Sequence, residues 1–96
     1  MNKKWALRRK VRRMRRRVED KRSFDTDASF AWTNSGGNYE RAQEIYRNKL
    51  ELAGISPTTI ILLIKVAMLV WEMLEHFNIF EVSGDQLTVM IGVDNE

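Results

Sequence analysis

Apolar residues recur every three or four positions in the first 22 residues, where most of the other residues are basic. The apolar residues Leu7, Val11, Met14 and Val18 are spaced 4, 3 and 4 positions apart. Two helices that pack against each other show this spacing along their line of contact. The pattern predicts a helix over residues 3–22, with these four residues forming one interaction seam.

The next segment, residues 23–38, has a different pattern. Its sequence, SFDTDASFAWTNSGGN, is rich in Ser, Thr, Asn, Asp and Gly, which is typical of a connector. Within it, SFAWT alternates so that Phe30 and Trp32 would share one side of an extended chain. This alternation predicts a short strand inside the connector.

Two further helices are marked by their ends. Asn38 is a good N-cap, and Gly54 is a good stop because glycine adopts the left-handed conformation without penalty. These signals predict a helix over residues 39–53. Ser56 then caps a second helix, with Pro57 in its first position, where a missing N–H costs nothing. That helix is predicted to cover residues 57–77.

The last stretch, IFEVSGDQLTVMIGV, predicts a β-hairpin. Phe80 and Val82 alternate with polar residues before a turn at residues 83–85. The residues that would line one side of the second strand are Leu87, Val89, Ile91 and Val93. The sequence therefore predicts an α+β fold: a basic helical arm (1–22), a connector (23–38) and a helix–helix–hairpin body (39–96).

Charge is distributed very unevenly along the chain. Residues 1–22 carry twelve Lys or Arg and two acidic residues, a net charge of +10, whereas residues 23–96 carry a net charge of −7. A basic arm on an acidic body is a sign of polyanion binding, and arginine makes forked contacts to phosphate. Nothing in the arm selects a base sequence, so we expect non-specific nucleic-acid binding. The residues expected to contact nucleic acid are Lys3, Lys4, Arg8, Arg9, Lys10, Arg12, Arg13, Arg15, Arg16, Arg17, Lys21 and Arg22.

Like charges four residues apart repel each other, so a free arm is expected to fray. A polyanion reverses this effect. Besides nucleic acid, the partner expected from charge is an acidic protein surface, on the same body or on a neighbouring one. An anionic membrane surface is a third option.

The segment from Ile60 to Val70 is apolar on every side of the predicted helix, with Lys65 as its one charged residue. Such a helix must be enclosed by something. At 1.5 Å per residue it is roughly 31 Å long, too long for one short helix and a few short strands to cover. It could be an ordinary core helix, but we expect it to pack in a multi-subunit assembly. The residues assigned to subunit packing are Ile60, Ile61, Leu62, Leu63, Ile64, Met68, Leu69 and Trp71.

The stretch LELAGISPTTI, residues 50–60, resembles the turn of the helix-turn-helix family. With the predicted hairpin after it, the resemblance implies a winged-helix DNA-binding regulator. The recognition helix of that family presents polar side chains to base edges. The corresponding positions here run from Ile60 to Ile64 and are all apolar.

Catalytic and metal-binding signals are few. The chain has no cysteine and a single histidine, His76, which excludes disulfides and any thiolate or multi-histidine metal site. Glu72 lies four residues before His76, but no nucleophile motif and no phosphate-binding glycine loop accompany this pair. We therefore predict a non-enzymatic protein with no catalytic residues, no metal site and no cofactor.

Together, these patterns predict a small structural or assembly protein that forms homo- or hetero-oligomers. Its composition is similar to that of small viral structural proteins, whose basic arms face a packaged genome. The expected location is the cytoplasm or a viral particle. Two alternatives are a single-span membrane protein with a cytoplasmic basic arm, of the lysis or envelope-associated type, and the winged-helix regulator.

Overall fold

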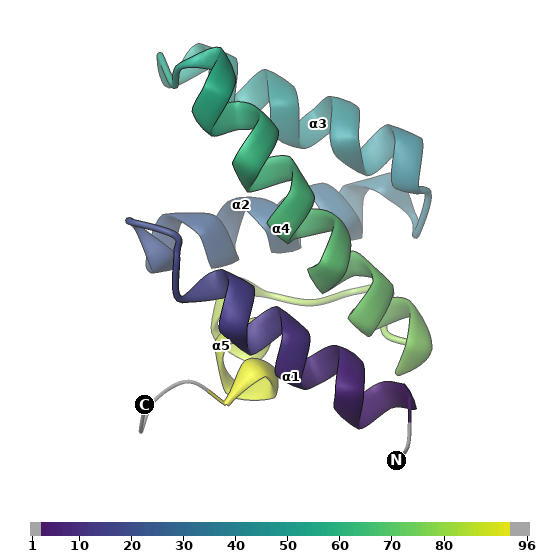
Figure 1. The fold of residues 1–96 in the computed structure, drawn as a ribbon. Coiled ribbons are helices and arrows are strands. Elements are labelled where there is room, and N and C mark those ends of the chain that lie inside the picture. The colour runs from purple at the N-terminus through teal and green to yellow at the C-terminus, as the bar shows by residue number, and fades with distance from the viewer. Residues whose placement is uncertain (1–2, 93–96) are drawn as a thin grey trace.

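Five helices and no strand make up residues 3–92, the part of the chain that this computed structural model describes (Figure 1). They are α1 (Lys3–Arg15), α2 (Lys21–Ser35), α3 (Tyr39–Leu52), α4 (Pro57–His76) and α5 (Gly84–Ile91). The predicted α+β fold is therefore wrong: residues 29–33 and the predicted second strand of the hairpin are helical, and the predicted first strand, around Phe80 and Val82, is irregular.

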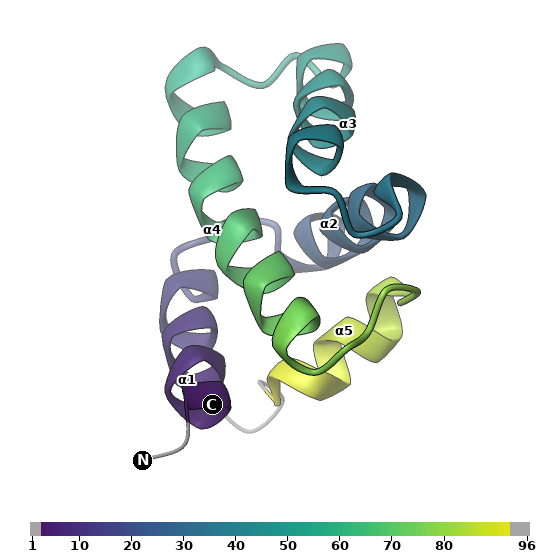
Figure 2. The ribbon, with the colours of Figure 1, turned by 90° about the vertical axis from the view of Figure 1, so that its right-hand side faces the viewer.

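The long helix α4 organises the other helices around it (Figures 1 and 2). The preceding helix, α3, lies beside its N-terminal half, and α1 packs against it from the other end of the molecule. The remaining contacts centre on α2, which packs against α3, α4 and α5. The basic segment is thus one of the packed helices of the fold.

The helix predicted over residues 3–22 is divided into two helices. The first ends at Arg15, where the backbone N–H of Arg17 bonds to the carbonyl of Met14 in a turn. The second begins after Asp20, whose side chain accepts a hydrogen bond of 3.0 Å from the backbone N–H of Ser23. Aspartate is a strong N-cap, and this cap starts a new helix where the periodicity alone predicted continuation.

Most of the segment predicted as a connector is helix α2, and the short strand within it is absent. Phe24, Ala28 and Ala31 are buried at helical spacing, together with Trp32. Phe30 is exposed on the opposite side, so it does not share a side with Trp32. The apparent alternation was a local coincidence within a longer helical period, and the helix cap at Asp20 decided the outcome.

The predicted C-terminal hairpin is also wrong, because its second strand is helix α5. Ser83 and Gln86 form a capping box: the Ser83 hydroxyl accepts from the N–H of Gln86, and the Gln86 side chain accepts from the N–H of Ser83. The buried residues Leu87 and Ile91 lie four positions apart, which suits a helix as well as a strand. The cap favours the helix. Val93, which was assigned to the same strand, lies outside the described residues.

The helices α3 and α4 match the predicted ranges to within one residue at each end. Asn38 and Ser56 cap them as expected, each accepting a hydrogen bond from the backbone N–H three residues on. Gly54 follows α3 with a φ of 76°, and the N–H of Ile55 bonds back to the carbonyl of Leu50. Only glycine adopts such a φ without strain, which explains why α3 ends there.

An aromatic cluster joins α2, α3 and α4. The rings of Trp32 and Trp71 stack with centroids 6.3 Å apart, and Tyr39 and Tyr46 meet them edge-on. Both indole N–H groups donate to backbone carbonyls, Trp71 to that of Ala28 at 3.0 Å. Each indole is therefore buried with its polar atom satisfied, which fixes how α2 crosses α4.

Candidate polyanion-binding surface

The interaction seam of α1 lies against the body of the same chain. Leu7 and Val11 on α1 are buried, as is Val18 in the turn that follows it, and Met14 is partly buried against the core. The helix is thus attached along one side, and the opposite side is left for its charged residues. This attachment determines which of the basic residues can reach a partner.

Arg15 is placed by this arrangement in the interior and does not join a surface. Its side chain is only 4% exposed, and its Nε donates to Asp25 Oδ1 at 2.8 Å while its Nη2 contacts the other carboxylate oxygen. The Thr88 hydroxyl also donates to Asp25, at 2.6 Å. Arg15 belongs to the predicted set of nucleic-acid contacts, but its buried guanidinium joins α1, α2 and α5. It follows Val11 by four positions, a sign that it lies beside the seam.

Arg8 and Arg12 attach α1 to the C-terminal end of α5. Arg8 Nε donates to the carbonyl of Met90 at 2.7 Å, and Arg12 Nε donates to that of Ile91 at 3.0 Å. Carbonyls in the last turn of a helix lack helical partners and carry the negative end of the helix dipole, so two cations are favoured there. Sequence reasoning missed this role because α5 was taken for a strand.

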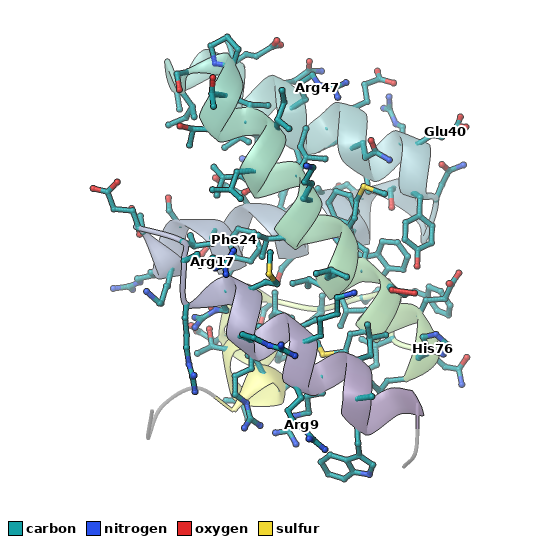
Figure 3. The ribbon with its side chains drawn as sticks, viewed as in Figure 1. Arg9, Arg17, Phe24, Glu40, Arg47 and His76 are labelled. Atoms are coloured by element: carbon teal, nitrogen blue, oxygen red, sulfur yellow. The ribbon has the colours of Figure 1, made fainter. Side chains whose placement is uncertain are left out.

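The outward side of α1 carries a row of exposed arginines, which we call the basic row: Arg9, Arg13 and Arg16. Together with the half-buried Arg12 they line a shallow groove of about 340 Å³. Figure 3 shows Arg9 on the side of α1 away from α4. The spacing of 4 and 3 residues gives about one guanidinium per helical turn of 5.4 Å.

Trp5 extends the basic row toward the start of α1, four residues before Arg9. It is 56% exposed, and the guanidinium carbon of Arg8 lies 5.4 Å from its ring centroid. Because Arg8 is itself held by α5, this cation–π contact orients the indole beside the arginines. An exposed, oriented aromatic ring next to a cationic row is suited to stacking on an unpaired base.

The other predicted basic contacts fall into three groups. Lys10, Arg17 and Arg22 are exposed, and Figure 3 labels Arg17 just beyond the end of α1. Lys21 is half-buried, with its Nζ donating to the carbonyl of Val18 at 3.0 Å. The side chains of Lys3 and Lys4 lie outside the described part of the structure.

The residues predicted to pack between subunits divide between the core and the surface. Ile60, Ile64 and Trp71 are buried within the chain. Leu63 and Leu69 are partly buried against the core. The exposed ones, which we call the outer face of α4, are Ile61, Leu62 and Met68. The structure thus leaves three of the eight predicted residues available to a partner.

By length and composition, α4 is the one helix within residues 3–92 that could cross a membrane. About 44% of its apolar window is buried in the fold. Val70 and Trp71 on its inner side are fully buried by the other helices. The helix thus has an inner side buried by the fold and an outer side that is partly exposed.

The histidine region shows no cluster of catalytic or metal-binding groups in the described part of the chain. No group of three or more His, Asp or Glu side chains comes together to hold a metal among residues 3–92. His76 is half-buried in the last turn of α4, where a helix C-terminus favours positive charge. The neighbouring Glu75 instead accepts a hydrogen bond of 3.0 Å from the Tyr39 hydroxyl. Burial, followed by this bond, raises the pKa of Tyr39 well above its usual value.

Comparison of the chain with protein-family models, with curated proteins and with solved structures gives no match. The wing that the helix-turn-helix resemblance implied is absent, since residues 84–91 are helix α5. The helix in the recognition position, α4, directs Ile60 and Ile64 into the core.

Proposed function

We propose that this chain is a non-enzymatic assembly protein that binds nucleic acid without sequence preference through the basic row and Trp5. In the same proposal, the outer face of α4 packs against a second copy of the chain. The observation that carries the first part is the row of exposed arginines on a helix whose opposite side is fixed to the body.

The geometry favours phosphate as the ligand of the basic row. Arginine offers a planar fork of donors that matches phosphate oxygens, and a row of one guanidinium per turn follows a repeating anion. The row contains only cationic side chains, which contact the backbone of a nucleic acid and carry no base selectivity. Binding should therefore depend strongly on salt and weakly on sequence.

Trp5 favours single-stranded over duplex nucleic acid. Stacking on an aromatic side chain requires an unpaired base, and it contributes about 1–3 kcal/mol per base. The indole of Trp5 lies at one end of the basic row, so one strand can place a base on the ring and its phosphates along the arginines. A duplex can use the arginines alone.

The assembly part rests on exposed apolar side chains along α4 and at the end of α3. Ile61 is 59% exposed, Leu62 and Met68 are also exposed, and Leu52 at the end of α3 is 88% exposed. Ile61 and Met68 lie seven residues apart and so share one side of α4, and exposed apolar groups that share one side of a helix are suited to an interaction surface. A second copy would offer the same side chains in return, as in a two-fold symmetric contact.

Fluorescence anisotropy with labelled oligonucleotides tests the nucleic-acid part. We expect the wild-type chain to bind single strands of unrelated sequence with similar affinity. If Arg12 and the three arginines of the basic row each neutralise one phosphate, log K should fall with log salt at a slope of about −3 for single strands. The triple variant Arg9→Gln/Arg13→Gln/Arg16→Gln should lose most of this binding and most of the slope.

The matched control removes the same charge elsewhere on the surface. Arg41, Arg47 and Lys65 are exposed on α3 and α4, so Arg41→Gln/Arg47→Gln/Lys65→Gln changes the net charge equally. Equal loss of binding in both triple variants would mean that net charge alone is responsible, and the basic row would be rejected. Binding to anionic vesicles but to no oligonucleotide would also reject the proposal, in favour of a membrane surface.

Sedimentation velocity over a range of protein concentrations tests the assembly part. We expect reversible self-association that the double variant Ile61→Lys/Leu62→Lys abolishes while circular dichroism stays unchanged. A wild-type chain that remains monomeric at all concentrations would contradict the second copy as the partner of α4.

A further inference from the structure

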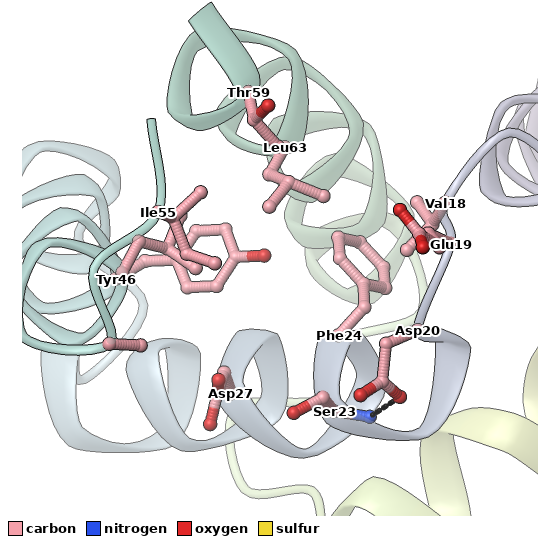
Figure 4. A pocket seen from close by; sticks show the side chains of 12 residues that line it. Val18, Glu19, Asp20, Ser23, Phe24, Asp27, Tyr46, Ile55, Thr59 and Leu63 are labelled. Atoms are coloured by element: carbon pink, nitrogen blue, oxygen red, sulfur yellow. Dashed lines mark hydrogen bonds between the residues drawn. The ribbon is translucent and has the colours of Figure 1, made fainter. Parts of the chain in front are cut away.

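A separate pocket of about 250 Å³ opens between α2, the end of α3 and the start of α4 (Figure 4). Its walls are mainly apolar, with Phe24 on one side and Leu50, Ile55 and Leu63 around the rest. An apolar cavity of about 150 Å³ is large enough to take up benzene. The pocket therefore has room for a ring or a short branched chain.

The Tyr46 hydroxyl points into this pocket and has no hydrogen-bond partner among the described residues. The tyrosine is 1% exposed, and Figure 4 shows its oxygen directed between Phe24 and Leu63. Since no buried side-chain nitrogen or oxygen among the described residues lacks a hydrogen-bond partner, the hydroxyl oxygen is accessible from the open pocket. A ligand in the pocket would lie within hydrogen-bonding reach of this hydroxyl.

The charged residues that line the pocket are all acidic. They are Glu19, Asp20 and Asp27. Asp20 already accepts the capping hydrogen bond from Ser23, and Asp27 lies 3.8 Å from Lys49 Nζ in a long ion pair. Glu19 is exposed at the edge of the pocket, where the chain leaves the α1–α2 turn.

Of the three carboxylates that line the pocket, Asp27 acts on the tyrosine. Burial raises the pKa of Tyr46 above its usual value, and the nearby carboxylates of Asp27 and Asp25 raise it further. The hydroxyl thus stays protonated at neutral pH. Its oxygen can accept an N–H from a ligand, or its O–H can donate.

We propose that this pocket binds a small organic cation, an amine with an aromatic or branched aliphatic body. The body lies against Phe24, Leu50 and Leu63, and the ammonium group faces Glu19 and Asp27 with the Tyr46 hydroxyl beside it. Small-molecule sites are typically apolar hollows with a few polar groups that orient the ligand, and this pocket has both features. The basic row is not involved, so this site does not depend on the proposed nucleic-acid binding.

An NMR titration of the ¹⁵N-labelled full chain with 2-phenylethylammonium tests the proposal. The matched probe is 3-phenylpropionate, which carries a similar body with the opposite charge. We expect saturable amide shifts around Phe24, Tyr46 and Leu63, with the amine binding about tenfold more tightly than the carboxylate. Equal affinities would overturn the assignment of a cation, and shifts that never saturate would overturn the site.

Two kinds of variant locate the binding. Leu63→Trp fills the pocket from α4 and should abolish the saturable shifts, whereas Leu62→Trp, one residue away on the outer face, should leave them unchanged. Glu19→Gln lies on the surface and should keep the fold intact while removing much of the preference for the amine. If Leu63→Trp proves unfolded, Glu19→Gln decides, and an unchanged amine preference in that variant would reject the proposal.

Discussion

The helices α1 and α4 are opposite in composition, yet each has one inner and one outer side. In the charged helix α1, the few apolar residues are buried and one arginine, Arg15, is buried with them. In the apolar helix α4, the inner residues form the core while Ile61 and Met68 remain exposed. The comparison teaches that the position of a residue around the helix decides its burial more than its type does.

The largest effect is expected from breaking the buried ion pair of α1. Asp25→Ala leaves the Arg15 guanidinium buried without a counter-charge, which should lower the free energy of unfolding by about 3–5 kcal/mol. Urea denaturation followed by circular dichroism measures this loss. The double variant Arg15→Met/Asp25→Leu should recover most of it. If it does not, the remaining loss comes from packing around Thr88 and not from the unpaired charge.

Truncating one apolar side chain on α1 and one on α4 tests whether the side of the helix decides the loss of stability. Val11 is fully buried on the scarcely apolar α1, so Val11→Ala should lower the free energy of unfolding by about 2 kcal/mol. Ile61→Ala removes more atoms from the far more apolar α4, but should change the stability of the monomer by less than about 0.5 kcal/mol. Equal losses in urea denaturation at low protein concentration would show that composition matters more than the side of the helix.

Polar substitutions in the seam test what the seam does for binding. Val11→Ser, Met14→Ser and Val18→Ser should disturb the placement of α1, seen as changed NMR amide shifts along α1 and loss of stability, more than they weaken polyanion affinity. The basic residues remain in each variant, and the electrostatic attraction remains with them. If stability and affinity fall together in every variant, or neither falls, the seam has no role in placing the arginines.

Single substitutions of Arg13 and Arg15 should distinguish an arginine that binds the partner from one that stabilises the fold, and the expected change in binding is smaller than in the variants above. Arg13→Gln removes one exposed cation and should reduce the salt slope for single strands by about 0.7 while stability stays within about 0.5 kcal/mol. Arg15→Gln, two residues on, should do the reverse, with a large loss of stability. Anisotropy and urea denaturation of the two variants provide the measurement, and identical behaviour would contradict the inward position of Arg15.

The smallest expected effect is a fall in the free energy of unfolding at alkaline pH, above about pH 10. Because the pKa of Tyr46 is higher in the folded chain than in the unfolded chain, the unfolded state loses its proton first as the pH rises. Stability is therefore unaffected below the unfolded pKa and falls above it, by up to about 1.4 kcal/mol per pH unit for this group. Tyr46→Phe should flatten this decline in urea denaturation at pH 10–11, and an unaltered slope would count against the shift.

The sequence predicted α3 and α4 because each has an N-cap at its start, with Gly54 ending α3. It did not predict α2 or α5, because their polar residues look like those of turns and their short apolar alternations fit strands. In both cases a side-chain cap, at Asp20 or Ser83, carries the deciding signal.

The candidate site could be predicted in part. The excess of arginine and the seam indicate the outward side of α1, which is where the basic row lies. The burial of Arg15 depends on Asp25 and Thr88, and the positions of Arg8 and Arg12 depend on α5 carbonyls about 80 residues away. Contacts at such a separation are set by packing and leave no local pattern. The pocket around Tyr46 also depends on packing, because its walls come from different helices.

The bonds from Arg8 and Arg12 to the end of α5 have a consequence for the order of folding. They join residues 82 and 79 positions apart, so they close nearly the whole length of the described chain. During synthesis α1 leaves the ribosome before α5, whose carbonyls hold the arginines of α1. Until α5 is made, Arg8 and Arg12 lack the carbonyls that hold them, although α1 can already pack against α4 and pair Arg15 with Asp25. Helix α5 therefore completes the placement of these two arginines only after the four preceding described helices have been made.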